Sequence, residues 1–324
     1  MKKFIALCLS ACLSISCLFG CGQKEPEDIS AFFFDTVIRI QVFDPPDAAL
    51  EEEILSICKK YDRLLSVDSK SGDIYRINHA KGETVKVNPE TAALIKKAFA
   101  ITEETKGAFD VTIEPVSSLW TFGGGADEEY IPTKDELKNA LTHTGTDKFR
   151  VTDHSVTKRD PEAGIDLGGI GKGFIADKIK KHLEKRGVKS ALINLGGNLV
   201  AVGSRTDGTP FHVGIQKPFA DAGTVITDVN IRDRSTVTSG VYERYYRRYD
   251  TLYHHLLNPK TGMPENNGLS SVTIVSDSSL TGDALSTAVF IKGLKEGKAF
   301  VKSHPEIKEA IFVTATNKVL RVTN

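Results

Sequence analysis

The nine residues from Asp166 to Phe174 read DLGGIGKGF and hold four glycines and one lysine. Glycine lets a backbone approach a phosphate group closely, and the start of a helix offers free N–H groups and the positive end of its dipole to an anion. Ile175, Ile179 and Leu183 follow at steps of four and predict a helix directly after this loop. The stretch therefore predicts an anion-binding loop that opens a helix, with a glycine-rich turn that binds nothing as the alternative.

Two common phosphate-binding motifs can be tested against this loop. A Walker A loop requires glycine at 166 and serine or threonine at 173, but the chain has Asp166 and Gly173, which excludes that motif. The spacing from Gly171 through Gly173 to Ala176 matches the dinucleotide fingerprint formally. However, the next predicted strand ends at Asn194 without an acidic residue, and helices and strands do not keep alternating. These observations disfavour a Rossmann fold.

The rest of the chain mixes predicted helices and strands without a clean domain boundary. Apolar periodicity and capping residues predict helices from about 50 to 64, from 88 to 105, after 172, from 283 to 291 and from 294 to 303. Strand patterns cover residues 33–43, 85–87, 191–194, 199–202, 211–216, 225–231, 235–238, 272–275, 310–314 and 319–322. This order predicts an α+β fold with mixed, mostly antiparallel sheets and flanking helices.

Composition narrows the class of protein. The chain has 324 residues, with 42 Lys and Arg against 42 Asp and Glu, so its formal net charge is zero. This balance argues against a general nucleic-acid binder, and a hydrophobic content of 40% is enough for a full core. Four of the five cysteines stand in the first 21 positions, so the cysteines do not form a disulfide framework.

The N-terminus has the pattern of an export signal. Lys2 and Lys3 precede an apolar run that ends at Gly20 and is too short to cross a bilayer comfortably. The run closes on Leu-Phe-Gly-Cys at Leu18 to Cys21, which looks like a bacterial lipobox. We therefore expect a signal peptide over 1–20, lipidation of Cys21, a polar tether over 21–30 and a folded domain over 31–324 in an extracytoplasmic, membrane-anchored protein. An ordinary secretory signal with an incidental cysteine is the alternative.

Five other motifs accompany the glycine-rich loop. They are GAFDVT (107–112), NLGGN (194–198), TSG (238–240), HHLLNPKTGMP (254–264) and GDALST (282–287). In this order they resemble the ApbE family, the FAD:protein FMN transferases, over about residues 33–290. The resemblance implies an ApbE-like fold and an enzyme that binds FAD and Mg²⁺ and moves FMN onto a threonine hydroxyl of a partner protein, releasing AMP.

The resemblance also suggests partners and leaves rival functions open. The implied acceptors are flavoprotein subunits of membrane redox complexes of the Rnf and Nqr type, and no nucleic acid is expected. An FAD pyrophosphatase that yields FMN and AMP would use the same site with water as acceptor. A lipoprotein that binds flavin without chemistry is the rival from another class, although a proton acceptor in the site would favour an enzyme.

Asp283 and Thr287 are four residues apart, so on a helix their side chains face one way and can share a hard cation. The resemblance implies that both are metal ligands, joined by a backbone carbonyl that we place at Gly169. Ser286 occupies a position that can be acidic in relatives, and we keep it as a candidate ligand.

The resemblance further implies a set of FAD-binding residues. They are Phe34, Ala108, Phe109, Asp110, Asp166, Lys172 and Leu257. We align Asp68 with a position where relatives often have a tyrosine against the cofactor, and this departure puts stacking there in doubt.

His255 stands where the family has a histidine ahead of its Asp-Pro-x-Thr-Gly turn, and Asn258 replaces that aspartate. Because histidine titrates near neutrality, His255 is the candidate acceptor for the threonine proton, whereas His254 is expected to face the other way and to be structural. The run YERYYRRY at 242–249 is basic and aromatic. We interpret it as a strand pair with solvated arginines, on which an acidic partner could dock.

Overall fold

The computed structural model describes residues 26–122 and 129–324. The expected signal peptide and the lipidation site at Cys21 lie outside these residues, so the structure does not bear on them. Among the described residues, no helix combines the length and the apolar character that a bilayer crossing requires.

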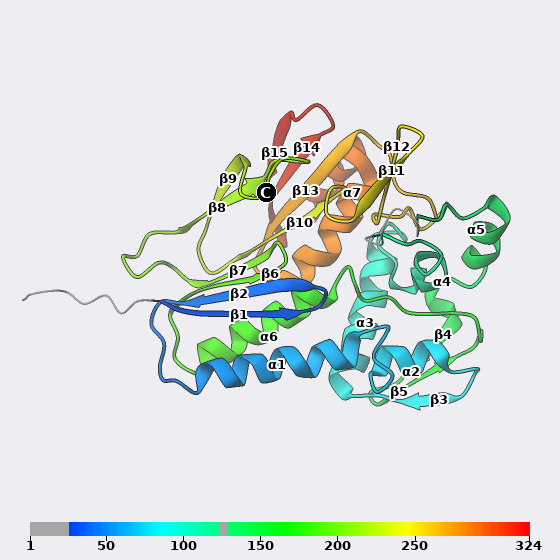
Figure 1. Cartoon of the computed structure of the whole chain (residues 1–324), viewed down its shortest axis with the longest axis horizontal. Coiled ribbons are helices and arrows are strands. Elements are labelled where there is room, and N and C mark those ends of the chain that lie inside the picture. Colours follow the sequence, from blue (N-terminus) through cyan, green and yellow to red (C-terminus); the bar gives the residue numbers. More distant parts are fainter. Residues whose placement is uncertain (1–25, 123–128) are drawn as a thin grey trace, which may run out of the picture.

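A large antiparallel sheet forms the centre of the molecule, as Figure 1 shows. Its order is β1-β2-β6-β7-β10-β13-β14-β15, and every neighbouring pair is antiparallel. The strands are β1 (Glu27–Phe33), β2 (Thr36–Val42), β6 (Ser190–Leu195), β7 (Asn198–Gly203), β10 (Ser235–Gly240), β13 (Leu269–Ser276), β14 (Ile307–Thr314) and β15 (Val319–Thr323). The prediction of an α+β fold with mostly antiparallel sheets is confirmed.

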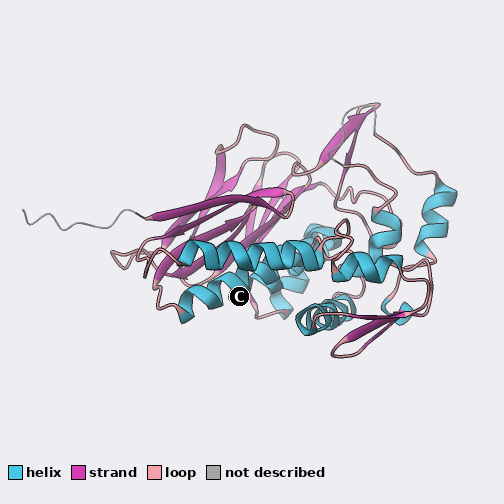
Figure 2. Ribbon diagram, turned by 60° about the horizontal axis from the view of Figure 1, so that its bottom comes forward, coloured by secondary structure: helices cyan, strands magenta, loops and turns pink. Residues whose placement is uncertain are grey.

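Both faces of this sheet are covered. Alternate residues of a strand point to opposite faces, so Val200 and Ile274 belong to the main core while Ala201 and Val275 belong to a second cluster. Helices α1 (Leu50–Leu65), α6 (Gly171–Lys185) and α7 (Ser279–Ser303) cover the first face (Figure 2). The two-stranded ribbon of β8 (Phe211–Gln216) and β9 (Val225–Ile231) covers the second face.

The remaining elements form a smaller region at one end of the sheet, on the right in Figure 1. It contains the helices α2 (Asp73–His79), α3 (Pro89–Glu104), η1 (Val111–Ile113), α4 (Glu114–Ser117), α5 (Lys134–Leu141) and η3 (Thr146–Lys148). Its small sheet has the order β3 (Thr84–Lys86), β5 (Ser155–Lys158) and β4 (Phe149–Val151). A hairpin of β11 (Tyr245–Arg248) and β12 (Thr251–His254) packs on α4 and α5 through a separate apolar cluster.

Two elements differ from the sequence-based expectation. Strand β1 begins at Glu27 and buries Ile29, so residues 27–30 of the expected tether belong to the sheet. Helix α7 begins at Ser279, four residues before the predicted start at 283. Gly293, with a φ of 70°, breaks its helical geometry, in agreement with the two helices predicted on either side of this residue. Asp283 therefore lies inside this helix, in its second turn, and not at its start.

Helices α6 and α7 cap one another, an arrangement that we call the reciprocal cap. Asp177 of α6 accepts hydrogen bonds from the backbone N–H groups of Ser279 (2.8 Å) and Leu280 (3.1 Å) at the start of α7. Asp283 of α7 accepts one from the backbone N–H of Gly173 (2.8 Å) in the first turn of α6. Two helix N-termini, each with the positive end of its dipole, are thus held beside each other by two carboxylates.

The reciprocal cap requires glycine at position 173. A Cβ atom there would lie 2.3 Å from the carbonyl oxygen of Ser279 and 2.7 Å from Cβ of Asp283, distances that force one helix away from the other. At Gly171, two residues earlier in the same helix, an added Cβ would meet no atom within 4 Å. The two glycines therefore form a matched pair for substitution.

We expect Gly173→Ala to lower the melting temperature by roughly 3–10 °C, because overpacking destabilises a core by about 1–3 kcal/mol. Gly171→Ala should leave it unchanged or slightly higher, since alanine is the better helix former. Scanning calorimetry of both variants checks this. Equal melting temperatures for the two variants would contradict the close contact of α6 with α7.

Candidate active site

Helix α2 holds the start of the glycine-rich loop in place. The side chain of Asn78 accepts a hydrogen bond from the backbone N–H of Ile165 (2.8 Å) and donates one to the carbonyl of the same residue (2.9 Å). The buried ammonium group of Lys158 donates to three backbone carbonyls of this region at 2.7 to 2.9 Å. Burial lowers the pKa of Lys158. These contacts hold the chain rigidly up to Asp166, the first residue of the loop.

Asp166 links the loop to the neighbouring GAFDVT segment. Its backbone N–H donates to the carbonyl of Val111 (2.7 Å), and its carboxylate accepts hydrogen bonds from Ser117 Oγ (3.0 Å) and from the N–H of Gly168 (2.8 Å). The carboxylate thus shapes the loop itself. The next residues turn directly into α6, which begins at Gly171 without a side-chain cap of its own.

Asp283 supplies the charge at the start of α6. The residue is 6% exposed, and Oδ2 accepts the hydrogen bond from Gly173. Burial raises the pKa of this carboxyl, while the positive charge of Lys172 and the bond from Gly173 lower it.

Thr287 and Gly169 meet at the same place. A Cβ atom on Gly169 would lie 3.8 Å from Thr287 Oγ1 and 3.1 Å from a ring carbon of Phe109. Thr287 Oγ1 is also 3.1 Å from Ser239 Oγ on β10. The structure thus brings together three residues that the sequence places far apart, and all three were expected in the site.

The oxygen atoms gathered here fit a hard divalent cation. Asp283 offers a carboxylate, Thr287 a hydroxyl and Gly169 a backbone carbonyl, all of them ligand types that Mg²⁺ and Ca²⁺ take. Ser286 is fully buried, and its hydroxyl bonds to the carbonyl of Asp283 (2.9 Å) and to Ser239 Oγ (2.8 Å). These bonds commit the Ser286 hydroxyl to internal packing.

His255 lies just after β12 and contacts the hairpin. Its backbone N–H and its ring Nδ1 both lie near the carbonyl oxygen of Arg244, at 3.1 and 3.3 Å. Burial, and then the charge of Arg244, lower the pKa of His255 to about 3, with Lys172 as a smaller contributor. The ring is therefore neutral at pH 7, and part of the residue still reaches solvent.

His254 has a different environment. It is 3% exposed, its Nε2 lies 3.2 Å from the carbonyl of Glu265, and its Nδ1 accepts a hydrogen bond from the N–H of Leu256 (3.3 Å). Burial lowers its pKa to about 4. These contacts agree with the structural role expected for His254.

The turn after Leu257 is organised by Asn258. Its Oδ1 accepts a hydrogen bond from the N–H of Lys260 (2.9 Å), and its Nδ2 donates to the carboxylate of Glu265 (2.6 Å). An aspartate here would place two carboxylates in contact, so Glu265 gives a physical reason for asparagine at this position. The turn is anchored to the smaller region by Trp120, whose Nε1 donates to the carbonyl of Gly262 (3.0 Å).

The other expected FAD-binding residues lie at different places around the glycine-rich loop and Asp283. Ala108 and Phe109 lie in the loop after α3, and Asp110 caps η1 by accepting hydrogen bonds from the N–H (2.8 Å) and the hydroxyl (2.6 Å) of Thr112. Burial raises the pKa of Asp110.

Phe34 stands in the β1–β2 turn with a φ of 55°, and its N–H donates to Asp62 (2.9 Å). Asp68 is exposed, and its N–H bonds to Ser66 Oγ (3.0 Å). Among the contacts recorded for residues 26–122 and 129–324, none joins Asp68 to the rest of the site.

Comparison with known proteins bears directly on this arrangement. The sequence model of the ApbE family matches residues 34–312. The chain belongs to the ApbE family. A protein of Klebsiella pneumoniae named FAD:protein FMN transferase is 36% identical over 294 residues, which are 90% of either chain. A protein of Vibrio cholerae with the same name is 30% identical over 302 residues, 91% of this chain and 90% of its own.

Solved structures of the ApbE family have the same fold. The ApbE protein of Thermotoga maritima superposes with a TM-score of 0.84 at 30% identity, covering 92% of this chain and 97% of its own. The flavin transferase ApbE of Vibrio cholerae superposes with a TM-score of 0.81 at 27% identity, covering 93% and 97%.

Three residues that position this ApbE site were not singled out from the sequence as site residues. Asn78 holds the loop, Asp177 caps α7, and Ser239 contacts both Ser286 and Thr287. Asp177 and Ser239 lie in or beside the motifs DLGGIGKGF and TSG, so proximity to those motifs was the signal available. Asn78 carries no such signal, because it acts through contacts distant in sequence.

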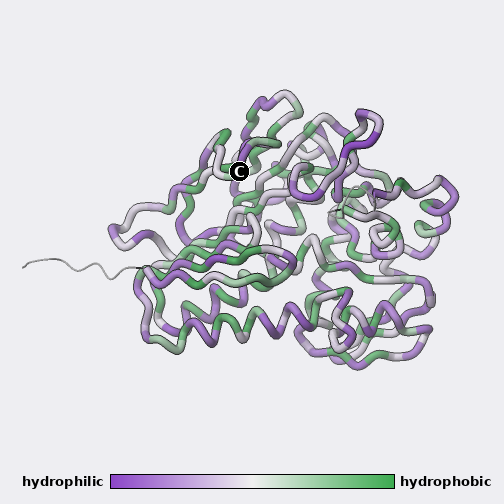
Figure 3. Tube along the Cα trace, viewed as in Figure 1, coloured by the Kyte–Doolittle hydropathy of each residue, from purple (hydrophilic) through white to green (hydrophobic). Residues whose placement is uncertain are grey.

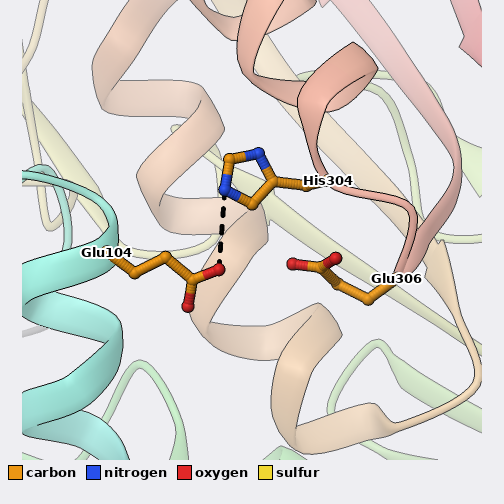
Figure 4. A group of neighbouring side chains, drawn as sticks. All are labelled: Glu104, His304 and Glu306. Atoms are coloured by element: carbon orange, nitrogen blue, oxygen red, sulfur yellow. Dashed lines mark ion pairs between the residues drawn. The ribbon is translucent and has the colours of Figure 1, made fainter.

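A further group of ionisable side chains lies elsewhere in this ApbE chain. Glu104, His304 and Glu306 converge at the far end of α7, where His304 Nε2 is 3.5 Å from Glu104 Oε1 (Figure 4). Position 304 is roughly 30 Å from Asp283 along the helix. The ion pair joins the end of α3 to the end of α7 and accounts for the arrangement.

Proposed function

We propose that this ApbE family member transfers FMN from FAD to a threonine hydroxyl of an acceptor protein and releases AMP. The observation that carries the proposal is the meeting of the α6 N-terminus with Asp283, whose Oδ2 accepts the hydrogen bond from Gly173 (2.8 Å), and of Gly169 with Thr287. His255 follows β12, where its ring contacts the carbonyl of Arg244. A pyrophosphate diester placed at the α6 N-terminus would meet cationic and metal-binding groups together.

The pyrophosphate of FAD suits the start of α6. Glycines at 168, 169, 171 and 173 leave the backbone open to a phosphate group, and the helix dipole favours negative charge at this end. Lys172 adds a full positive charge, and the named relatives act on FAD according to their names. We infer that Phe109, packed against Gly169, helps to shape the cofactor site.

Asp283, Thr287 and Gly169 would hold Mg²⁺ beside this pyrophosphate. A bound Mg²⁺ neutralises charge that develops on phosphate oxygens during displacement at phosphorus. The reciprocal cap fixes Asp283 from the side of α6, because its Oδ2 is already bonded to Gly173. Oδ1 of Asp283 would be the oxygen that remains for a cation.

His255 takes the proton in the proposed reaction. Its Nδ1 lies 3.3 Å from the Arg244 carbonyl, so a hydrogen on Nδ1 is donated there and Nε2 is free to accept the threonine proton. The threonine oxygen bonds to the FMN-side phosphorus, and the bond from that phosphorus to the AMP oxygen breaks. The phosphates of bound FAD would oppose the charges of Arg244 and Lys172 and raise the proton affinity of the ring.

We further propose where the protein acts and on what. The pattern from Leu18 to Cys21 supports lipid attachment at Cys21 and an extracytoplasmic place on the cell membrane. Flavoprotein subunits of Rnf- or Nqr-type redox complexes are the proposed acceptors, since they would be carried by the same membrane.

We expect His255→Ala to bind FAD about as tightly as the wild type and to transfer FMN roughly a hundredfold more slowly, the scale of losing a general base. Single-turnover transfer rates and FAD titrations separate the two effects. His212→Ala is the matched control, because this β8 histidine has a side chain 65% exposed and lies outside the site. Loss of FAD affinity alone would make His255 a positioning residue.

We expect Asp283→Asn to abolish Mg²⁺-dependent transfer while far-UV circular dichroism stays unchanged, because the amide oxygen can still accept the Gly173 hydrogen bond. A titration with Mg²⁺ should show saturation for the wild type and no response for the variant. Full transfer in excess EDTA would exclude the proposed cation site.

We expect Cys21→Ser to abolish lipid attachment and cleavage by the lipoprotein peptidase, so the variant should accumulate as a longer, unlipidated precursor. Fractionation followed by intact mass measurement checks this. Membrane partition of an identically processed Cys21→Ser species would refute the anchor.

A further inference from the structure

The β11–β12 hairpin carries an exposed aromatic and cationic surface that meets His255 at Arg244. We call it the hairpin surface and define it by Phe219, Arg244, Tyr245 and Arg247. The ring of Phe219, from the β8–β9 loop, meets the ring of Tyr245 edge to face at 5.2 Å. The guanidinium carbon of Arg247 lies 5.5 Å from the centre of the same Phe219 ring. The β8–β9 loop and strand β11, which are distant in sequence, thus build one surface.

The hairpin has a buried side that leaves this surface free. Tyr246 is 6% exposed, belongs to the apolar cluster with α4 and α5, and donates a hydrogen bond to the carbonyl of Tyr130 (2.8 Å). Its neighbours Tyr245 and Arg247 point the other way, as alternation along a strand requires. Packing against the body therefore explains Tyr246 and does not explain Tyr245 or Arg247.

Phe219 is exposed at a conformational cost. Phe219 is 44% exposed. Its φ is 58°, in the left-handed region that bulky residues rarely adopt. Such conformations cost on the order of 1–3 kcal/mol and cluster at functional sites. The hairpin tip adds Tyr249, which is 84% exposed.

The charge of the surface is one-sided. Residues 244 to 248 read RYYRR and contain no acid. Across the described ranges 26–122 and 129–324, no carboxylate lies within 4.0 Å of the guanidinium groups of Arg244 and Arg247. Arginine and aromatic residues are the types most enriched at the centres of protein interfaces.

The position of the surface identifies its occupant. The carbonyl of Arg244 contacts both the backbone N–H and the ring of His255. An acceptor whose threonine reaches His255 must also cover the residues next to it. We propose that the hairpin surface docks the acceptor protein, binding an acidic segment with an apolar side chain next to the modified threonine. This inference rests on the proposed function and adds the surface and the chemistry by which the acceptor is selected.

Arg247 and Phe219 then have distinct tasks. Arg247 pairs with a carboxylate of the acceptor, for which its planar guanidinium is suited. Phe219 contributes apolar contact and holds the Arg247 guanidinium over its ring. Neither residue touches the reacting atoms, so both should affect acceptor binding and not the chemical step.

The test uses a purified Rnf-type flavoprotein subunit as acceptor and the full folded domain as enzyme. For Arg247→Glu and Phe219→Ala we expect the KM for acceptor to rise at least about tenfold. The kcat and the affinity for FAD should stay within about twofold of wild type. Arg150→Glu is the matched control, because Arg150 is an exposed arginine on β4.

Direct binding separates this proposal from the proposed function. Acceptor binding is measured by calorimetry with wild type and with Arg247→Glu at low and at high salt. Binding that Arg247→Glu weakens, without any flavin transfer, supports docking and contradicts the transferase. Transfer with an unchanged KM in both variants overturns docking and leaves the transferase intact. Absence of any binding by the wild type also overturns docking to this acceptor class.

A charge exchange gives the sharpest outcome. Replacing an aspartate near the acceptor threonine by lysine should weaken wild-type binding and restore binding to Arg247→Glu. Equal losses for both enzymes would overturn the pairing of Arg247 with an acceptor carboxylate.

Discussion

The reciprocal cap between α6 and α7 is the constraint on which the site depends. Two helix N-termini with like dipole ends would repel each other if brought together without compensation. Asp177 and Asp283 supply that compensation, each accepting N–H groups from the other's helix. Hydrogen bonds to charged groups contribute about 1.5–3 kcal/mol each, so the pair fixes the helices firmly. The first turn of α6 and the turn of α7 that carries Asp283 are thereby held in a fixed relation to each other.

The same constraint explains why the sequence was informative here. The first turn of α6 lies against the backbone of α7 and therefore requires glycine at position 173. The carboxylate that accepts its N–H must stand at a fixed position in α7, which is that of Asp283. The motifs DLGGIGKGF and GDALST are therefore short in sequence but reflect a contact between two helices. The structure brings Gly169, Phe109 and Thr287 together. Strands β6, β7, β10, β13, β14 and β15 of the large sheet were also predicted from the sequence, because they are rich in β-branched and apolar residues.

Other features could not be read from local patterns. Helix α2 has seven residues, too few for its periodicity to stand out, yet its Asn78 holds the loop through contacts 87 positions away. Strand β1 begins in a polar segment, since only Ile29 of its first residues is buried. Asp68 was placed by alignment alone, and no contact within the described part of the chain ties it to the site.

The early start of β1 limits how far the folded body can lie from Cys21. Because the sheet begins at Glu27, only the five residues 22–26 lie between Cys21 and the folded body. The six residue-to-residue steps from Cys21 to Glu27 span at most roughly 20 Å even when fully extended. If Cys21 carries a lipid, the edge strand is kept at the bilayer surface, while the hairpin lies toward the other end of the longest axis (Figure 3). An acceptor that reaches the hairpin would then extend away from the lipid headgroups, as a protein with a folded domain on that side of the membrane does.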